Sequence, residues 1–354
     1  MRQSGQLART QALASMLGAF ALLGACSQSR QVEFEVSIAG TGALRLWECT
    51  DEDAVLTVED DRGEGARGPR ALSVTPVSSA VVATRSGSIG RDPILTGVVT
   101  NLGTGRDGLR WATLTDPSEL DGQVALMVRE SEIPGWRRVP VPLGTRGALL
   151  LSAAKGYAWR DAEVLRTENA GKTWGSFGRV RIGRVSPGRA PLVSSTGDLW
   201  VPIGKPGGDA AIGVLRQSGE LGVQFHWPGE SLDSLRWGSP GILVIALGST
   251  DGRGFRIILL DENTGRQRVV LSREDGALWE LRVRGVEMAL HQIGMVTPRG
   301  PLEHGKGRLL VSRDAGKTWD SRDIRSDDFE SICISGGGMW AASSRTRRLR
   351  WLPK

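Results

Sequence analysis

The chain has 354 residues, a formal net charge of +6, three cysteines and three histidines. This length accommodates two ordinary domains or one large all-β domain, so length alone does not choose between them. The positive charge is mild, and apart from the tail SRTRRLRWLPK no Lys- and Arg-rich run is interleaved with aromatic residues. We therefore expect no nucleic-acid partner.

The first 25 residues predict a secretory leader. Arg2 and Arg9 are the only charged side chains before residue 30, and they precede the apolar run LASMLGAFALLGA. This run is shorter than the about 20 apolar residues that cross a bilayer, which is typical of a signal peptide and not of a membrane span. Removing the leader lowers the net charge from +6 to +4, because it contains two arginines and no acid.

The leader ends in Leu23-Gly24-Ala25-Cys26, which resembles the bacterial lipobox. The resemblance implies that residues 1–25 are removed and that Cys26 is acylated and becomes the first residue of the mature protein. Three acyl chains would hold the protein on a membrane surface, and Ser27 after the cysteine favours the outer membrane, facing the periplasm. The alternative is an ordinary secretory signal with an incidental cysteine.

After Cys26 the chain alternates short apolar runs with turn residues. Typical runs are ALLLSAA (148–154), GILVIAL (241–247) and FRIILL (255–260), which are too short for ordinary helices and are separated by Gly, Asp, Asn, Ser or Pro. No amphipathic segment with helical periodicity is longer than about two turns. We therefore expect residues 26–354 to form a single all-β domain.

The chain contains a repeat. VLRTENAGKTW (164–174) and LLVSRDAGKTW (309–319) are nearly the same phrase, and VLRQSGELGVQF (214–225) and ILLDENTGRQR (258–268) fit between them. Their turn centres, Asn169, Gly219, Asn263 and Asp314, are 50, 44 and 51 residues apart. Fainter candidates are LMVRESEIPGW (126–136) and LTVEDDRGEG (56–65). A second phrase, a glycine followed closely by tryptophan, recurs as GYAW (156–159), GDLW (197–200) and GGMW (337–340).

A period of about 45 residues is typical of the four-stranded blades of a β-propeller. The chain after residue 25 is long enough for about seven such blades, or six if its N-terminal part is an extra strand or cap. This spacing predicts the architecture and says nothing about a reaction, because function depends on the loops grafted on a propeller.

The two full phrases resemble the Asp-box, or BNR repeat, whose pattern is S-x-D-x-G-x-T-W. The matching positions are Ser312, Asp314, Gly316, Thr318 and Trp319 in one copy, and Thr167, Asn169, Gly171, Thr173 and Trp174 in the other. In the family this hairpin joins the third and fourth strands of a blade, on the face away from the ligand site. We expect the Asp or Asn to accept hydrogen bonds from backbone N–H groups two residues on, the glycine to supply a positive φ, and the tryptophan to flatten against its hairpin. The resemblance thus implies structural roles for these residues.

Asp-box propellers include sialidases, which use a Tyr nucleophile, an arginine triad and an early Arg-Ile-Pro phrase. The only tyrosine of this chain is Tyr157, inside the GYAW phrase, and the nearest early phrase is Arg91-Asp92-Pro93-Ile94. A sialidase-like glycoside hydrolase or a glycan-binding protein therefore stays an alternative, and sequence spacing does not show whether two carboxylates face each other.

No other catalytic or ligand-binding motif is present. His226, His291 and His304 stand alone, whereas a zinc site needs three or four ligands. AGKT occurs twice but lacks the leading glycine and the following helix of a phosphate loop. We expect no catalytic, cofactor-binding or metal-binding residues.

Charge is unevenly distributed along the chain. Residues 48–64 hold eight acids and one arginine. Arg179, Arg181, Arg184 and Arg189 form a basic run, in which Arg179 and Arg181 are expected to share one face of a strand. We interpret this run as an exposed blade face, with an anionic partner or lipid headgroup as the alternative.

Once Cys26 is acylated, Cys49 and Cys333 remain. A propeller commonly closes by letting an N-terminal strand complete the last blade, which would bring these two positions together, and an oxidising periplasm permits a disulfide there. The same closure would bring the acidic stretch 48–64 near Arg345, Arg347, Arg348 and Arg350. The alternative is two unpaired, buried thiols.

These features favour a membrane-anchored periplasmic lipoprotein that binds an unidentified protein without catalysing a reaction. In its expected architecture and location the chain resembles Asp-box lipoproteins that assist the assembly of membrane complexes, such as photosystem II stability factors. A lipoprotein that neutralises a periplasmic toxin would have the same features.

Overall fold

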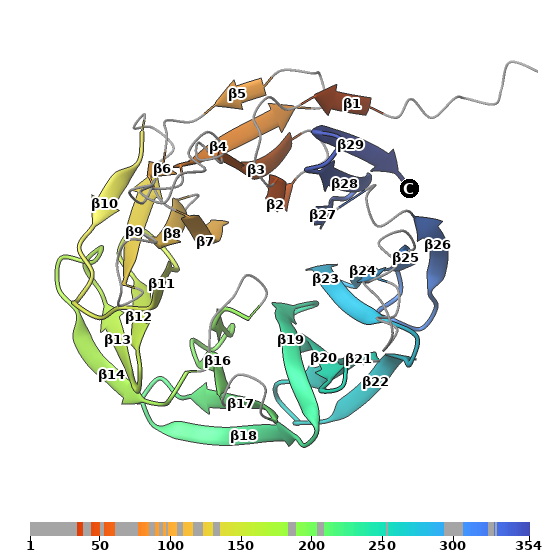
Figure 1. The fold of residues 1–354 in the computed structure, drawn as a ribbon. Helices are drawn as coiled ribbons and strands as arrows, with labels where there is room; N and C mark the ends of the chain where they lie inside the picture. The colour runs from red at the N-terminus through yellow and green to blue at the C-terminus, as the bar shows by residue number, and fades with distance from the viewer. Residues whose placement is uncertain are drawn as a thin grey trace, which may run out of the picture.

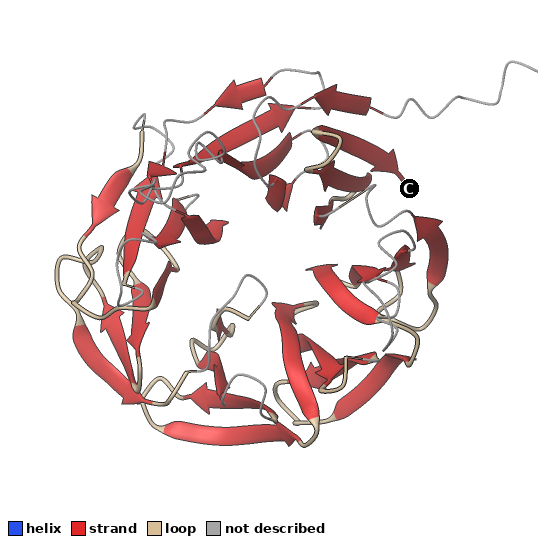
Figure 2. Cartoon of the chain, in the orientation of Figure 1, coloured by secondary structure: helices blue, strands red, loops and turns tan. Residues whose placement is uncertain are grey.

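The structure is a computed structural model. It describes residues 34–37, 44–49, 53–60, 77–84, 89–91, 95–96, 98–104, 109–115, 123–129, 135–182, 189–203, 209–252, 254–293, 307–324, 329 and 331–354. The leader 1–25, Cys26, Arg184 and His304 lie outside these residues, so the expectations for them stay predictions. The described part of the chain is built of strands and turns (Figure 2), and it contains no helix long and apolar enough to cross a membrane.

The strands form seven sheets arranged in a ring (Figure 1). We number the sheets as blades 1 to 7, starting with the blade that begins with β2. Blades 1 to 3 consist of β2 (Leu44–Cys49), β3 (Asp53–Asp60), β4 (Val77–Thr84) and β5 (Ile89–Arg91), with β6 (Leu95–Thr96) beside β4; β7 (Val98–Thr104), β8 (Arg110–Thr115), β9 (Val124–Arg129) and β10 (Arg137–Val139); and β11 (Gly147–Leu150), β12 (Gly156–Arg160), β13 (Glu163–Thr167) and β14 (Gly175–Arg179).

Blades 4 to 6 continue in the same order. They consist of β15 (Leu192–Val193), β16 (Leu199–Ile203), β17 (Ala210–Leu215) and β18 (Leu221–Trp227); β19 (Glu230–Trp237), β20 (Ile242–Ser249), β21 (Phe255–Asp261) and β22 (Gln267–Arg273); and β23 (Ala277–Arg284), β24 (Glu287–Ile293), β25 (Gly307–Ser312) and β26 (Asp320–Ile324). Blade 7 consists of β27 (Ser331–Ile334), β28 (Gly338–Ser343), β29 (Arg348–Pro353) and β1 (Phe34–Ser37). The prediction of an all-β propeller with about seven blades is confirmed.

The first strand of a blade lies near the axis and the fourth at the rim, as β19 and β22 show in Figure 1. The middle strands are continuous apolar runs, such as ILVIALGS in β20, because neighbouring blades cover both of their faces. Rim strands are polar, and DSRDI in β26 is mostly exposed. The apolar clusters accordingly join blades to one another: Leu46 and Leu56 of blade 1 pack with Trp340 and Trp351 of blade 7.

The ring closes where the two ends of the described chain meet. Strand β1 pairs antiparallel with β29, placing Phe34 opposite Trp351. At the axis, Cys49 on β2 and Cys333 on β27 form a disulfide, with Cα atoms 6.1 Å apart. Blade 7 is thus completed by an N-terminal strand at the rim and bonded to blade 1 at the axis. The approach of the acidic stretch 48–64 to the basic tail stays a prediction, because most of its acidic side chains lie outside the described residues.

The repeated phrases mark fixed places in the blades. The Gly–Trp phrase falls on the second strand: GYAW lies on β12, GDLW runs into β16 and GGMW into β28. The candidates at 126–136, 164–174, 214–225, 258–268 and 309–319 each span a junction between third and fourth strands. The candidate LTVEDDRGEG (56–65) is wrong, because its first five residues belong to β3, which is the second strand of blade 1.

Candidate functional site

The hairpin at 312–319 is held by its own side chains. The Ser312 hydroxyl accepts a hydrogen bond from Gly316 N at 2.8 Å. The Asp314 carboxylate accepts from Thr318 N at 2.9 Å and from the Thr318 hydroxyl at 2.7 Å. These hydrogen bonds to Thr318 lower the pKa of Asp314 to about 2. The amide that Asp314 binds is thus four residues on, whereas we had expected an amide two residues on.

The hairpin at 167–174 repeats this arrangement with Thr for Ser and Asn for Asp. Thr167 Oγ1 accepts from Gly171 N at 2.9 Å, and Asn169 Oδ1 accepts from Thr173 N at 2.9 Å. Because Asn169 is an amide, its Nδ2 donates to Thr173 Oγ1 at 2.8 Å, reversing the direction of the bond seen at Asp314. Gly171 and Gly316 have φ of +79° and +75°, the left-handed region that favours glycine.

The tryptophans of both hairpins reach the preceding blade. Trp174 Nε1 donates to Pro140 O, just after β10, at 2.9 Å, and Trp319 Nε1 donates to Val270 O on β22 at 3.0 Å. The expectation that each tryptophan flattens only against its own hairpin is therefore incomplete. A Cβ added to Gly316 would lie 2.6 Å from Val270 Cβ, so the turn itself touches the neighbouring blade. These hairpins clamp consecutive blades together at the rim.

The residues considered for catalysis lie in structural surroundings. Tyr157 is buried on β12 with its ring edge against Phe177, and burial raises the pKa of its phenol. His226 on β18 is exposed. His291 on β24 is buried, neither of its ring nitrogens has a hydrogen-bond partner within the described chain, and burial lowers its pKa. The described ranges contain no group of three His, Cys, Asp or Glu side chains that could hold a metal ion.

The basic run does not form a single strand face. β14 ends at Arg179, so the expectation that Arg181 belongs to the same strand is wrong, although both arginines are exposed. The chain turns inward there, because Val180 is buried and Ile182 forms a bridge with Ile203 of blade 4. Arg189 forms an ion pair with Asp233 on β19 at 3.1 Å.

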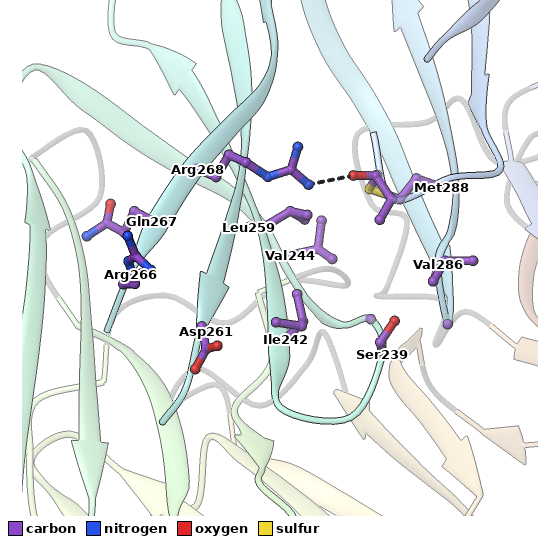
Figure 3. A pocket seen from close by; sticks show the side chains of 13 residues that line it. Ser239, Ile242, Val244, Leu259, Asp261, Arg266, Gln267, Arg268, Val286 and Met288 are labelled. Atoms are coloured by element: carbon purple, nitrogen blue, oxygen red, sulfur yellow. Dashed lines mark hydrogen bonds between the residues drawn. The ribbon is translucent and has the colours of Figure 1, made fainter. Parts of the chain in front are cut away.

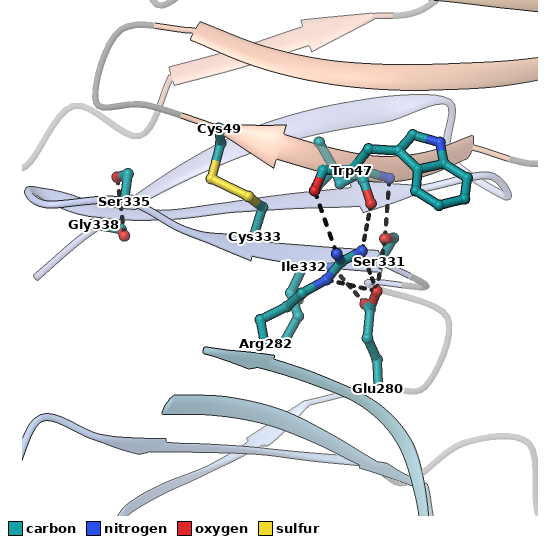
Figure 4. Close-up of a disulfide and its surroundings, with 10 residues drawn as sticks. Trp47, Cys49, Glu280, Arg282, Ser331, Ile332, Cys333, Ser335 and Gly338 are labelled. Carbon is teal, nitrogen blue, oxygen red and sulfur yellow. Dashed lines mark hydrogen bonds and ion pairs between the residues drawn. A yellow bond between two sulfur atoms is a disulfide. The ribbon is translucent and has the colours of Figure 1, made fainter. Parts of the chain in front are cut away.

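A largely buried ion pair connects the innermost strands of three blades (Figure 4). It lies where the first and last blades meet, which we call the seam. Arg282 on β23 pairs with Glu280 at 2.6 Å, and the two side chains are 14% and 17% exposed. Arg282 also donates to the backbone oxygens of Leu46 and Trp47 on β2. Glu280 accepts from Ile332 N on β27 at 2.7 Å. This cluster lies beside the Cys49–Cys333 disulfide and has a structural role at the join between the first and last blades.

A cavity of about 530 Å³ lies between blades 5 and 6 (Figure 3). It opens on the face of the ring where the third strand of each blade turns into the fourth. Its apolar walls come from both blades and comprise Ile242, Val244, Leu259, Val286 and Met288. Arg266 and Arg268 stand on one side, and Arg268 donates to Ala315 O of the opposite blade at 3.0 Å. Val286 is 47% exposed on the rim of the cavity. Asp261 also lines the cavity, so its charged groups are two arginines and one acid. An apolar cavity of this size with a few polar groups is typical of a binding site.

Sequence reasoning missed this cavity. Its lining comes from four strands and four turns, and each residue by itself has an ordinary core or surface character. The one available signal was the valine in the turn RGVE (284–287), where a polar residue is usual.

Comparison with known proteins supports the fold and no more. No family model matches the chain, and no curated protein matches it. It is similar to the β-propeller domain of the Trilobed protease from Pyrococcus furiosus, with a TM-score of 0.52 and 9% identity over 87% of this chain and 93% of that one. That domain has an open velcro topology, whereas β1 and β29 share a sheet here.

Larger enzymes contain a similar propeller. A puromycin hydrolase has a TM-score of 0.54 and 11% identity over 85% of this chain and 50% of its own. An acylaminoacyl peptidase from Pyrococcus horikoshii has a TM-score of 0.52 and 10% identity, over 84% and 51%. This chain therefore spans about half the length of these two enzymes, and identities this low show a shared β-propeller fold alone.

Proposed function

We propose that this protein is a membrane-anchored, non-enzymatic propeller that binds another protein, either to assist the assembly of a complex or to neutralise a toxin. The matching turns at 167–174 and 312–319 support a place among the Asp-box propellers. The lipobox at Leu23–Cys26 supports the anchor. In this proposal the acylated Cys26 anchors the propeller to the periplasmic side of the outer membrane, and the propeller binds the partner.

The observation that carries the proposal is the cavity between blades 5 and 6. An apolar recess beside an exposed valine and arginines has the chemistry of a protein-docking centre, where an apolar anchor is buried and charge fixes its orientation. The complementary partner is a peptide segment that inserts an apolar side chain and places a carboxylate near the guanidinium groups. The apolar walls and Arg266 together select such a segment over a purely polar ligand.

A site-specific photo-crosslinker tests the docking site. With p-benzoylphenylalanine at Val286, we expect one discrete adduct in intact cells. The same group at Leu143, which is 83% exposed between blades 2 and 3, should give no such adduct. The partner peptide identified from the adduct should bind the purified protein, and Val286→Asp should weaken that binding about tenfold or more. Equal crosslinking at both positions, or binding unaffected by Val286→Asp, would contradict the proposal.

The anchor is tested separately by metabolic labelling with palmitate. Wild-type protein should be labelled, and Cys26→Ala should give unlabelled, uncleaved or mislocalised precursor. A wild-type protein without label would remove the anchor from the proposal and leave the docking site untouched.

The non-enzymatic part of the proposal is tested with fluorogenic glycosides, including sialosides. We expect no turnover by the purified protein. Turnover that a single acid-to-amide substitution abolishes would instead support the glycoside hydrolase alternative.

A further inference from the structure

Arg236 occupies an unusual position near the axis of the ring. It is the penultimate residue of β19, the innermost strand of blade 5, and it is neither fully buried nor exposed. Within the part of the chain that the structure describes, no side chain or backbone oxygen forms a hydrogen bond or ion pair with its guanidinium. Burial and the nearby positive charge of Arg282 lower the pKa of Arg236 to about 10.

Glu280, the acid whose charge acts on Arg236, already accepts four hydrogen bonds from other groups. Glu280 Oε1 accepts hydrogen bonds from Arg282 Nε at 2.9 Å, from Arg282 Nη2 at 2.6 Å and from the Ser331 hydroxyl at 3.2 Å. Its Oε2 accepts from Ile332 N at 2.7 Å. Arg236, Arg282 and Glu280 together carry a net charge of +1, because there are two cations and one anion. Among the described residues, one positive charge beside this ion pair therefore lacks a counter-ion of its own.

Strand register connects this charge to the cavity. Arg236 lies opposite Val244, Val244 opposite Leu259, and Leu259 opposite Arg268. Directly opposed residues in antiparallel strands point to the same face of the sheet. The four side chains therefore form a row across blade 5, from the axis to the rim, with an arginine at each end and two apolar residues between them.

Three of the four residues of this row line the cavity, and Arg236 is the next residue of the row beyond its lining. Val244, Leu259 and Arg268 line it, and so does Gly238, two residues after Arg236. Strands lie about 4.8 Å apart, so the backbone positions of the two arginines are separated by roughly 14 Å. At the rim end, Arg268 is bonded to Ala315 O of blade 6. At the axial end, Arg236 has no such bond.

We infer that Arg236 binds a carboxylate at the axial end of the blade 5–6 cavity, and that the ligand of this cavity is an apolar group carrying that carboxylate. A carboxylate matches the single unbalanced charge and accepts two parallel hydrogen bonds from one guanidinium. A phosphate, with a charge near −2 at neutral pH, would exceed it. This inference rests on the proposed function for the source of the carboxylate, which is then an acidic residue or the C-terminus of the docked segment.

The binding test uses hexanoate as a probe, with hexanol as its uncharged counterpart. Isothermal titration calorimetry of the full-length protein should show hexanoate binding more tightly than hexanol. Arg236→Met should weaken hexanoate binding about tenfold and leave hexanol unchanged, because it removes a charge-assisted hydrogen bond and retains apolar length. Arg268→Met tests the other end of the row, and Arg138→Met, at an exposed position on β10 of blade 2, controls for a general loss of positive charge.

Thermal melting gives a second, independent readout. A desolvated cation without a counter-ion costs stability, so Arg236→Met should melt at or above the wild-type temperature in carboxylate-free buffer. Hexanoate should raise the melting temperature of wild type and not that of Arg236→Met. Melting of Arg236→Met well below wild type would show that Arg236 is a structural partner of Glu280 and would overturn the inference.

Three further outcomes would also support or overturn the carboxylate site. Loss of hexanoate binding in Arg268→Met with retention in Arg236→Met would move the carboxylate to the rim and overturn the inference. Equal loss in Arg138→Met would show that hexanoate responds only to the total positive charge and would overturn the inference. Binding of hexanoate through Arg236 without any crosslink at Val286 would support the carboxylate site while contradicting the proposed protein partner, so the two failures are distinguishable.

Discussion

The rim and the axis of this ring are held together differently. At the rim, two nearly identical hairpins each donate a tryptophan N–H to the preceding blade, at Pro140 and Val270. At the axis, a disulfide and a buried ion pair join the first and last blades, and each occurs once within the described chain. A contact needed between several pairs of blades is repeated in the sequence, whereas a contact needed only at the seam is not.

Removing the disulfide should have the largest effect. Cys49 and Cys333 are 284 residues apart, and on the chain-entropy model closing such a loop contributes roughly 5 kcal/mol, as an upper value. The double Cys→Ser variant should therefore unfold at a much lower denaturant concentration. Dithiothreitol should lower the unfolding midpoint of wild type and leave that of the variant unchanged. An unchanged wild-type midpoint would show that the disulfide does not hold the seam.

Breaking the ion pair at the axis should rank next. Glu280→Gln leaves Arg282 charged and largely buried, which typically costs about 3 kcal/mol or more. A matched surface control is Asp323→Asn, because Asp323 pairs with Arg308 but its side chain is 88% exposed. That change should cost less than about 1 kcal/mol. Similar losses in both variants, measured by urea unfolding, would mean that the seam pair is no stronger than a surface pair.

At the rim, Trp319→Ala should cost about 3 kcal/mol, because the indole is partly buried against blade 5 and donates to Val270 O. Trp319→Phe keeps most of the packing and loses the hydrogen bond, so it should cost about 1 kcal/mol. If both variants unfold at the wild-type midpoint, the hairpin does not clamp the two blades.

Much of this organisation follows from the sequence. The Gly and Trp of each full hairpin, the period of the phrases and the two spare cysteines predict the turns, the number of blades and a bond at the seam. The tryptophan's partners at Pro140 and Val270 were not predictable, because they are backbone oxygens in blades whose packing the sequence does not describe. The error at 56–65 has a related cause, since an apolar run followed by acids and glycine also fits the end of a second strand.

The candidate site was harder to foresee than the fold. The row Arg236, Val244, Leu259 and Arg268 exists only in the register of four strands, and shifting any one strand by a single residue would turn its side chain to the other face. Arg236 in the sequence is one of many arginines. Within the described residues Arg236 has no hydrogen-bond partner, because Glu280 is bonded to residues of blades 6 and 7.

The pH dependence of stability should contain one contribution from the interior, due to His291, and one from the rim, due to Asp314, and both are small. His291 is buried, and its pKa in the folded protein lies below the ordinary value of 6.5. The unfolded chain therefore binds its proton first, so stability is full above pH 6.5 and falls as pH drops towards the folded pKa. Glu280 opposes this shift only in part. His291→Leu should remove this part of the pH dependence in urea unfolding, and an unaltered profile would contradict the assignment.

Asp314 should act at lower pH. Its pKa is about 2 in the folded protein against an ordinary 3.8, so its contribution is complete above pH 3.8 and is lost as pH falls towards 2. Asp314→Asn should flatten the stability profile in this range with little change at pH 7, since Asn169 fills the same place in the other hairpin. An Asn variant with the wild-type profile below pH 4 would place the titration elsewhere.

The central claim is that the first and last blades are joined both at the rim and at the axis. Non-reducing peptide mapping of protein purified without reductant tests it most directly, because the bond at the axis is covalent. The account predicts a single linked peptide pair that contains Cys49 and Cys333 and separates on reduction. Free thiols at both positions in protein kept under oxidising conditions would contradict it.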